Sequence, residues 1–147
     1  MEAIGSGAGD DRLTNTLSGS QWDLLASYLQ PVLLAQSEVL FEQHANDRTL
    51  YFVESGSLSV HYEDDQGRLR LAIVGAGSAL GECAFFSHRP RNATVQAGSA
   101  CKLWMLTAVR FTELTNRQPA IALAVTMAVG AVLAKRLSNR RRRVAAT

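Results

Sequence analysis

The feature that most constrains the fold is a series of short apolar segments between about residues 32 and 106, most of which end at a turn signal. Segments rich in Val, Ile, Leu, Phe and Tyr and separated by Gly, Ser, Asn or Asp are typical of β-strands. The Ser55-Gly56 pair separates two such segments and predicts a tight hairpin. Strands this short and this regularly spaced predict an antiparallel β-roll or jelly roll of about eight strands. The expected strands include residues 32–34, 39–41, 50–53, 58–62, 69–74, 94–97 and 101–106.

Helices are expected on both sides of this strand series. On the N-terminal side, Ser20 is a candidate N-cap for a helix over residues 21–30, which Pro31 would end. On the C-terminal side, a short helix is expected over residues 107–113. A longer helix should begin at Pro119, a residue well suited to the first helical turn, and continue to about Arg142. The predicted fold class is therefore mainly β with flanking helices.

The composition divides this globular chain, which is 47% hydrophobic and 19% charged, into three parts. Residues 1–20 are rich in Gly, Ser, Thr, Asn and Asp and are expected to form a disordered arm. The β-roll should occupy residues 21–118, and the long helix with a basic tail should occupy residues 119–147. Six of the 15 Lys and Arg residues lie from position 135 onward, four of them at Arg140–Arg143. This tail either ends a solvated helix or contacts nucleic acid or anionic lipid.

Residues 118–134 contain no charged side chain. A membrane span is disfavoured, because the segment is at the short limit for crossing a bilayer and alanine contributes little to partitioning. We expect instead an Ala-rich helix that packs on its own barrel and on a partner helix, although packing within one chain alone is the simpler alternative. The two expected stripes are Ile121, Val125, Ala128, Val132 and Lys135, and Leu123, Met127, Gly130, Ala134 and Leu137.

Residues 81–95, Gly-Glu-Cys-Ala-Phe-Phe-Ser-His-Arg-Pro-Arg-Asn-Ala-Thr-Val, have the composition of a site for a small phosphorylated ring. Gly81 and two alanines allow the backbone to approach a ligand closely. Arg91 supplies a fixed, always-charged fork for phosphate oxygens. Glu82 can accept a hydrogen bond from a sugar hydroxyl. The segment therefore predicts binding of a phosphorylated sugar.

The spacing Gly-Glu-x-Ala-x₅-Pro-Arg-x-Ala-Thr-Val closely resembles the phosphate-binding cassette of cyclic nucleotide-binding domains. That family includes bacterial catabolite activator proteins, the regulatory subunits of cyclic AMP-dependent kinase and cyclic nucleotide-gated channels. Residues 50–60 resemble its strand–glycine–strand hairpin, and the likeness covers residues 21–137. The chain departs from the family at His44-Ala45, where a Gly-Asp turn is frequent, and at Ala79, where a large apolar residue is common.

The resemblance implies reversible binding of a 3′,5′-cyclic nucleotide. It implies that Arg91 pairs with the cyclic phosphate, that Glu82 accepts from the ribose 2′-hydroxyl, and that backbone N–H groups around Ala84, Asn92 and Ala93 complete the cradle. Because cyclic GMP-selective members often have Thr or Ser where this chain has Asn92, cAMP is favoured over cGMP. The predicted ligand-binding residues are Gly81, Glu82, Cys83, Ala84, Arg91, Asn92 and Ala93, with Val60, Leu71 and Ile73 as the apolar wall.

The resemblance also implies how a signal leaves the site. The long terminal helix of bacterial relatives pairs in a dimer and covers the base, so a homodimer through this helix is expected. Ligand should order the cassette, repack Phe85 and Phe86, and shift an existing equilibrium of the helix. One alternative is an orphan member that binds no nucleotide and serves as a dimerisation or scaffold module.

An enzyme is disfavoured as a second alternative. His44, His61 and His88 are widely spaced and lack the His-x-His pair of a cupin metal site, and no Ser/His/Asp set has recognisable spacing. No metal or cofactor is therefore expected. Cys83 and Cys101 also lack metal-ligand spacing and are expected to be buried free thiols.

The ends of the sequence add two expectations. The N-terminus has neither a basic start nor an apolar run, so no export signal is expected, and the free thiols fit a reducing cytoplasm. Only four residues follow Arg143, so no helix-turn-helix DNA-binding domain is expected in this chain.

Overall fold

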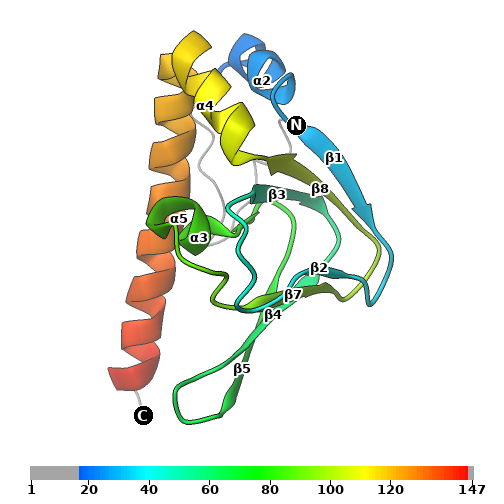
Figure 1. Cartoon of the computed structure of the whole chain (residues 1–147), viewed down its shortest axis with the longest axis vertical. Coiled ribbons are helices and arrows are strands. Elements are labelled where there is room, and N and C mark those ends of the chain that lie inside the picture. The colour runs from blue at the N-terminus through cyan, green and yellow to red at the C-terminus, as the bar shows by residue number, and fades with distance from the viewer. Residues whose placement is uncertain (1–16, 146–147) are drawn as a thin grey trace.

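The structure of the chain, a computed structural model, describes residues 17–145, and in these residues two four-stranded antiparallel sheets are flanked by helices (Figure 1). The strand order is β1-β8-β3-β6 in the first sheet and β2-β7-β4-β5 in the second. These eight strands confirm the predicted β-roll. The strands are β1 (Gln30–Leu34), β2 (Val39–Phe41), β3 (Leu50–Ser55), β4 (Leu58–Glu63), β5 (Leu69–Val74), β6 (Ala79–Leu80), β7 (Thr94–Ala97) and β8 (Cys101–Leu106).

The N-terminal helix differs from its prediction at both ends. Helix α2 (Gly19–Ala26) begins two residues earlier than predicted, because its N-cap is Ser18, which forms a capping box with Gln21. The assignment of Ser20 as the cap is therefore wrong. The expected arm of residues 1–20 is structured from Ser18 onward, and residues 1–16 lie outside the described residues.

Helix α2 also ends before the predicted Pro31. Residues 27–29 form turns back onto the helix, and β1 then pairs with β8 from Gln30↔Met105 to Leu34↔Cys101. Of the predicted helix, residues 27–29 are therefore in turns and Gln30 is in strand β1. Pro31 is tolerated in the strand because β1 is at the edge of its sheet, where a missing N–H leaves no neighbour unpaired.

Strand β3 lies between two apolar cores. Tyr51 and Val53 face the core between the sheets, whereas Leu50 and Phe52 face a second core under the helices. Alternate side chains of a strand point to opposite faces, so this strand is apolar at successive positions rather than alternating. Strand β3 is thus buried on both sides, between the core of the roll and the core under the helices.

The C-terminal half of the chain forms three helices. Helix α3 (Glu82–Ser87) lies in the cassette, α4 (Ala108–Arg117) follows β8 with Thr107 as its N-cap, and α5 (Pro119–Ala145) runs the length of the molecule on one side (Figure 1). The predicted helices after Thr107 and from Pro119 are confirmed, although both extend further than expected. The side chains of Arg140–Arg143 lie outside what the structure describes.

Helix α5 buries one face and exposes another. The buried residues pack on the core under the helices, and Leu123, Met127 and Leu137 of the second predicted stripe are exposed. By length and composition, Pro119–Asn139 is the one helix of the described residues that is long and apolar enough to cross a membrane, a property that it shares with core helices of soluble proteins. The buried residues of the helix are Ile121, Ala122, Val125, Val129 and Val132.

Candidate functional site

A pocket of about 1070 Å³ lies between the second sheet, the cassette and α5. All ten residues predicted to bind ligand line this pocket, so the structure brings the predicted set together. The cassette supplies one wall, β4 and β5 supply a second, and the C-terminal part of α5 supplies a third. The contributions from α5, none of which the sequence analysis assigned to the ligand site, are Leu133, Arg136, Leu137 and Asn139.

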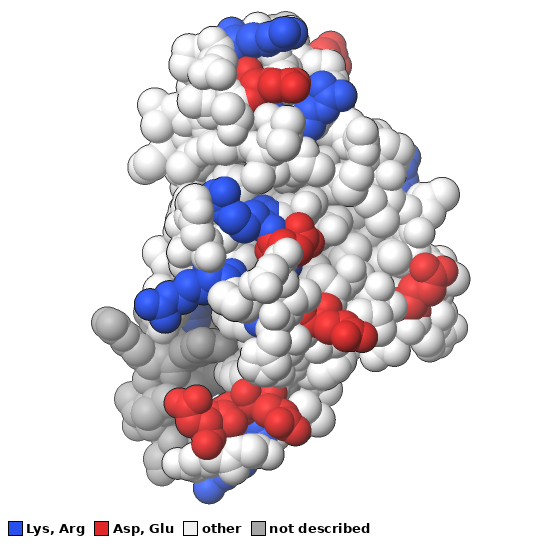
Figure 2. Space-filling view, viewed as in Figure 1, with Lys and Arg blue, Asp and Glu red and all other residues white. Residues whose placement is uncertain are grey.

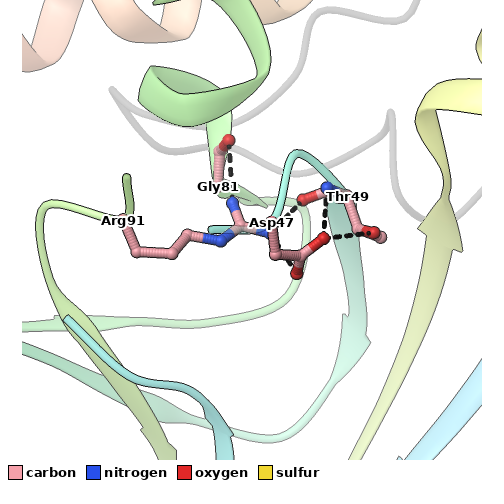
Figure 3. Close-up of polar contacts among 4 residues, drawn as sticks. All are labelled: Asp47, Thr49, Gly81 and Arg91. Carbon is pink, nitrogen blue, oxygen red and sulfur yellow. Dashed lines mark hydrogen bonds and ion pairs between the residues drawn. The ribbon is translucent and has the colours of Figure 1, made fainter. Parts of the chain in front are cut away.

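Arg91 is the most enclosed polar residue of the pocket, with only 2% of its surface exposed. Its Nη2 donates to the Asp47 carboxylate at 2.8 Å and to the Thr49 carbonyl at 2.7 Å (Figure 3). Its Nη1 donates to the Gly81 carbonyl at 3.2 Å (Figure 3). The guanidinium also lies over the Phe41 ring, with Cζ 4.0 Å from the ring centre. Arg91 is therefore a structural residue as well as a lining residue.

One donor of Arg91 has no acceptor. A guanidinium carries five N–H groups, and the Nε–H of Arg91 is buried without a hydrogen-bond partner among the described residues. A buried donor left unpaired costs about 1–3 kcal/mol relative to a paired one. A ligand with anionic oxygens at this end of the pocket would remove that cost if the side chain shifted to meet it.

The backbone of Arg91 is fixed as firmly as its side chain. Its N–H donates to the Ala45 carbonyl at 2.8 Å, and its carbonyl accepts from the His44 N–H at 2.7 Å. His44 has φ 76°, in the left-handed region that favours glycine. A left-handed conformation thus occurs at the position where the family often has a Gly-Asp turn, and here a histidine adopts it.

Asp47 is held in its ionised form. Burial raises its pKa, but the hydrogen bonds from Arg91 and from the backbone and hydroxyl of Thr49 outweigh burial, and the net effect is a pKa below the ordinary value. Its side chain is 39% exposed, whereas that of Arg91 is almost fully enclosed. The pair therefore joins a buried cation to a carboxylate at the edge of solvent.

Glu82 connects the cassette to the long helix. It occupies the first turn of α3 and is buried, and its Oε1 lies 2.9 Å from Nη1 of Arg136 on α5. Both side chains line the pocket and both are more than three-quarters shielded from solvent. An ion pair with this degree of shielding is screened less by salt than one on the open surface. The carboxylate predicted to bind a sugar hydroxyl is thus already paired with the helix predicted to move.

Gly81 is required by both backbone conformation and space. It is the N-cap of α3 with φ 82°, a conformation that glycine adopts at no steric cost. A Cβ at this position would overlap Nη1 of Arg91 and lie 2.8 Å from the Thr49 carbonyl oxygen. The glycine therefore lets the cassette backbone lie directly against the side chain of Arg91.

The predicted apolar wall is present but open to solvent. Leu71 and Ile73 on β5 are 64% and 65% exposed, and Val60 on β4 is partly buried. They are open because β5 is the edge strand of its sheet and nothing in the described chain covers that side of the pocket mouth. Cys83 also departs from expectation, because it is only partly buried and lines the pocket, whereas Cys101 is buried as predicted.

The sequence analysis missed the residues that hold the predicted ones in place. Asp47 and Thr49 lie in the segment between β2 and β3, and no spacing rule links them to Arg91. Arg136 and its neighbour Lys135 are the first charged residues after the uncharged segment 118–134, but the sequence alone does not show which of the two faces the barrel. Among the described residues, no group of three or more His, Cys, Asp or Glu is placed to hold a metal ion.

The fold and site can now be compared with known proteins. Residues 31–118 match the model of the cyclic nucleotide-binding domain family. The chain is 34% identical over 98 residues to a cAMP-activated global transcriptional regulator of Haemophilus influenzae, which covers 65% of this chain and 42% of the relative. It is 38% identical over 66 residues to the type II regulatory subunit of cAMP-dependent protein kinase from Drosophila melanogaster, which covers 44% of this chain and 18% of the relative.

Solved structures give the same result. A cyclic nucleotide-binding domain from Methylobacillus flagellatus superposes with a TM-score of 0.85 at 20% identity, over 97% of this chain and 79% of that one. The catabolite activator protein of Thermus thermophilus gives 0.75 at 27% identity, over 88% of this chain and 60% of that one. This chain belongs to the cyclic nucleotide-binding domain family. It spans less than half the length of the two curated relatives described above.

Proposed function

We propose that this chain binds a 3′,5′-cyclic nucleotide reversibly and without chemistry, and that it prefers cAMP to cGMP. The observation that carries the proposal is the presence of Arg91 and Glu82 in one pocket, on either side of the close-packed backbone at Gly81. An arginine fork suits the cyclic phosphate, and a carboxylate suits the ribose 2′-hydroxyl. The names of the relatives, a cAMP-activated regulator and a cAMP-dependent kinase subunit, support the same ligand class.

Phosphate binding requires Arg91 to change partners. In the structure its side chain donates to Asp47, Thr49 and Gly81, and Nε–H has no acceptor among the described residues. A phosphate would take Nε–H and compete with Asp47 for the remainder of the fork. Backbone N–H groups around Ala84, Asn92 and Ala93 would complete the anion site, as in the family.

The preference for cAMP rests on the base end of the pocket. Asn92 lines the pocket and occupies the position at which cyclic GMP-selective members often have Thr or Ser. Val60, Leu71 and Ile73 of the second sheet and Leu133 and Leu137 of α5 line the same pocket, and they would provide apolar surface for a purine. The preference is expressed as a ratio of affinities and is measured directly by titration of both nucleotides.

Occupancy would reach α5 through Glu82. A ribose hydroxyl that donates to Glu82 shares the carboxylate with Arg136, and therefore changes the geometry or strength of the ion pair to α5. Phe85 offers a second route, since its ring lies edge-on to Phe111 of α4 with centres 4.9 Å apart. Ligand would thus shift an existing equilibrium of the C-terminal helix rather than create a new state.

The exposed face of α5 would pair with a second copy of the chain. Leu123, Met127 and Leu137 are each more than half exposed, and small residues at 130, 131 and 134 lie between them. Small residues allow the close approach of two helix backbones, and the large ones provide the apolar area to bury. The substitution Met127→Lys should make a dimer dissociate, as measured by light scattering at matched concentrations, and an unchanged mass would contradict this interface.

The charges on the face of the molecule shown in Figure 2 do not support nucleic-acid binding. On the face shown in Figure 2 the described basic and acidic side chains are mixed, and acidic ones gather at the end where Figure 1 places the β4–β5 hairpin. A continuous basic surface, which phosphate-backbone binding requires, is absent from the described part of that face. Cys83 and Cys101 do not form a disulfide, which agrees with the cytoplasmic location that we infer for the chain.

The proposal is tested by calorimetric titration of the wild-type protein with cAMP and with cGMP. Because the hydrogen bonds of Arg91 also stabilise the fold, Arg91→Lys is preferred to Arg91→Ala. Glu82→Gln tests the ribose contact with a side chain of nearly the same size. Arg89→Ala is the matched control, since Arg89 lies in the same cassette, is exposed and does not line the pocket. Loss of an arginine–phosphate contact should weaken binding by about two orders of magnitude, with Arg89→Ala close to wild type.

An orphan scaffold is the second candidate, and one observation favours it. Arg91 is already engaged by Asp47, Thr49 and Gly81, as expected for an arginine retained for folding alone. Either nucleotide at millimolar concentration could give no heat of binding and no protection from hydrogen exchange in the folded wild-type protein. In that case the orphan-scaffold hypothesis replaces the binding proposal. A tenfold preference for cGMP would instead leave nucleotide binding intact and reverse the base preference.

A further inference from the structure

The segment Asp47–Thr49, between β2 and β3, contacts two separate parts of the cassette. Asp47 and Thr49 hold the side chain of Arg91, as described above. Arg48, which stands between them, donates from Nη2 to the Phe85 carbonyl of α3 at 3.0 Å. Three consecutive residues therefore attach to both ends of the candidate site, although Arg48 itself does not line the pocket.

The contact of Arg48 is not an incidental surface contact. Its side chain is partly buried, and its Nε is fully buried without a hydrogen-bond partner among the described residues. Enclosing a guanidinium to this degree carries a desolvation cost that a loose surface arginine avoids. The arrangement persists only if the bond to the α3 backbone, together with the packing around it, outweighs that cost.

Helix α3 needs such an anchor because it has only six residues. A helix this short is not stable on its own, and its terminal carbonyls lack intrahelical partners. The Cys83 carbonyl accepts from the Ser87 hydroxyl, and the Ala84 carbonyl accepts from the His88 N–H. The Phe85 carbonyl accepts from Arg48, which is the one donor of these three that comes from outside the cassette.

We propose that Arg48 is a positioning residue that sets the place of α3 relative to Arg91. The proposal rests on the proposed function, because a cyclic nucleotide is a rigid ring that must reach Arg91 with its phosphate and Glu82 with its ribose at once. Both residues are tied to one three-residue segment, Arg91 directly and Glu82 through α3. A shift of α3 therefore lowers affinity even though Arg48 makes no contact with the ligand.

The experiment compares Arg48→Met, which keeps the length of the stem and removes the donor, with Arg48→Lys, which keeps the charge and one donor group. Arg110→Met is the matched control, because Arg110 forms an exposed ion pair with Glu113 on α4, away from the pocket. Two quantities are measured: hydrogen exchange over residues 82–91 in the ligand-free protein, and affinity for cAMP. Melting temperature is recorded for each variant.

Arg48→Met should exchange about tenfold faster over residues 82–91 and bind cAMP about tenfold more weakly, since a hydrogen bond from a charged group is lost. Exchange in α4 and α5 should match wild type. Arg48→Lys should fall between wild type and Arg48→Met in both quantities, and Arg110→Met should match wild type. If Arg48→Met does not fold, the intermediate behaviour of Arg48→Lys decides.

Three results would overturn the proposal. One is unchanged exchange over residues 82–91 in Arg48→Met, and another is faster exchange there with unchanged affinity for cAMP. The third is a loss spread evenly over the whole chain, which a merely structural residue would produce. If the wild-type protein binds no cyclic nucleotide, the proposed function fails, and the exchange of the free protein still decides whether Arg48 places α3.

Discussion

The substitution Gly81→Ala should lower the free energy of unfolding by about 2–5 kcal/mol, through two separable effects. The first is the backbone conformation, because φ 82° places an L-residue in the left-handed region at a cost of about 1–2 kcal/mol. The second is contact, because the added Cβ overlaps Nη1 of Arg91 and lies 2.8 Å from the Thr49 carbonyl oxygen. The carbonyl belongs to the backbone and cannot move aside cheaply, so Arg91 must shift, at an overpacking cost of about 1–3 kcal/mol.

Gly67→Ala is the control that separates these effects. Gly67 has φ 73°, and a Cβ there would meet nothing within 4 Å, so only the backbone cost applies. Urea denaturation, followed by the fluorescence of Trp22 and Trp104, gives the free energy of unfolding of both variants. Gly81→Ala should be less stable than Gly67→Ala by about 1–3 kcal/mol. Equal losses in the two variants would refute the argument that Gly81 is reserved for the side chain of Arg91.

Two further predictions concern Asp47 and His44, which both form hydrogen bonds with Arg91. Asp47→Asn should cost about 1–2 kcal/mol at pH 7, a figure kept small because the carboxylate is 39% exposed. Because the pKa of Asp47 is lowered by folding, this stability is present above the ordinary value of 3.8 and is lost as the pH falls through the folded value. Denaturation at pH 7 and at a series of acidic pH values below 3.8 should therefore show the difference between wild type and variant shrinking as the pH falls, and a constant difference would contradict the assignment. His44→Gly should raise stability by about 0.5–1 kcal/mol in thermal melts, since glycine relieves φ 76°, whereas His44→Ala should not.

The strand framework could be predicted because it depends on local patterns. Apolar runs, glycine turns and the Ser55-Gly56 hairpin recur along the chain, and each marks its own strand. The exception is β6, which has two residues and exists because Leu80 and Ala79 pair with Tyr51 and Phe52. A strand this short has no period of its own, so only the pairing partner reveals it.

The start of the N-terminal helix could be predicted from the sequence, whereas its end could not. Ser18 followed three residues later by Gln21 is the pattern of a capping box, and it predicts the observed start better than Ser20 does. The early end at Ala26 had no local signal. It follows from the pairing of β1 with β8, a contact between residues about 70 positions apart that overrides helix propensity.

The predicted binding residues share one pocket, but the residues that hold them could not be found from spacing. Asp47 and Arg91 are 44 positions apart, and each is an ordinary charged residue in a loop when viewed alone. The Glu82–Arg136 pair depends on the rotation of α5 about its axis, which is set by packing of its buried face. Charge pairing of this kind is a property of the assembled fold rather than of any sequence window.

These two ion pairs determine what ligand binding would involve. Arg91 is paired with Asp47 and Glu82 is paired with Arg136 before any ligand enters, so a cyclic nucleotide would bind by exchanging partners rather than by filling vacant sites. A pocket with unpaired charges would bind more tightly, but it would change little when filled. Here the displaced groups belong to the β2–β3 segment and to α5, and both elements would experience a change in charge pairing when the site fills. A ligand shifts an equilibrium only by its differential affinity for the two states, and the exchange of partners at Arg91 and Glu82 is a physical source of that difference.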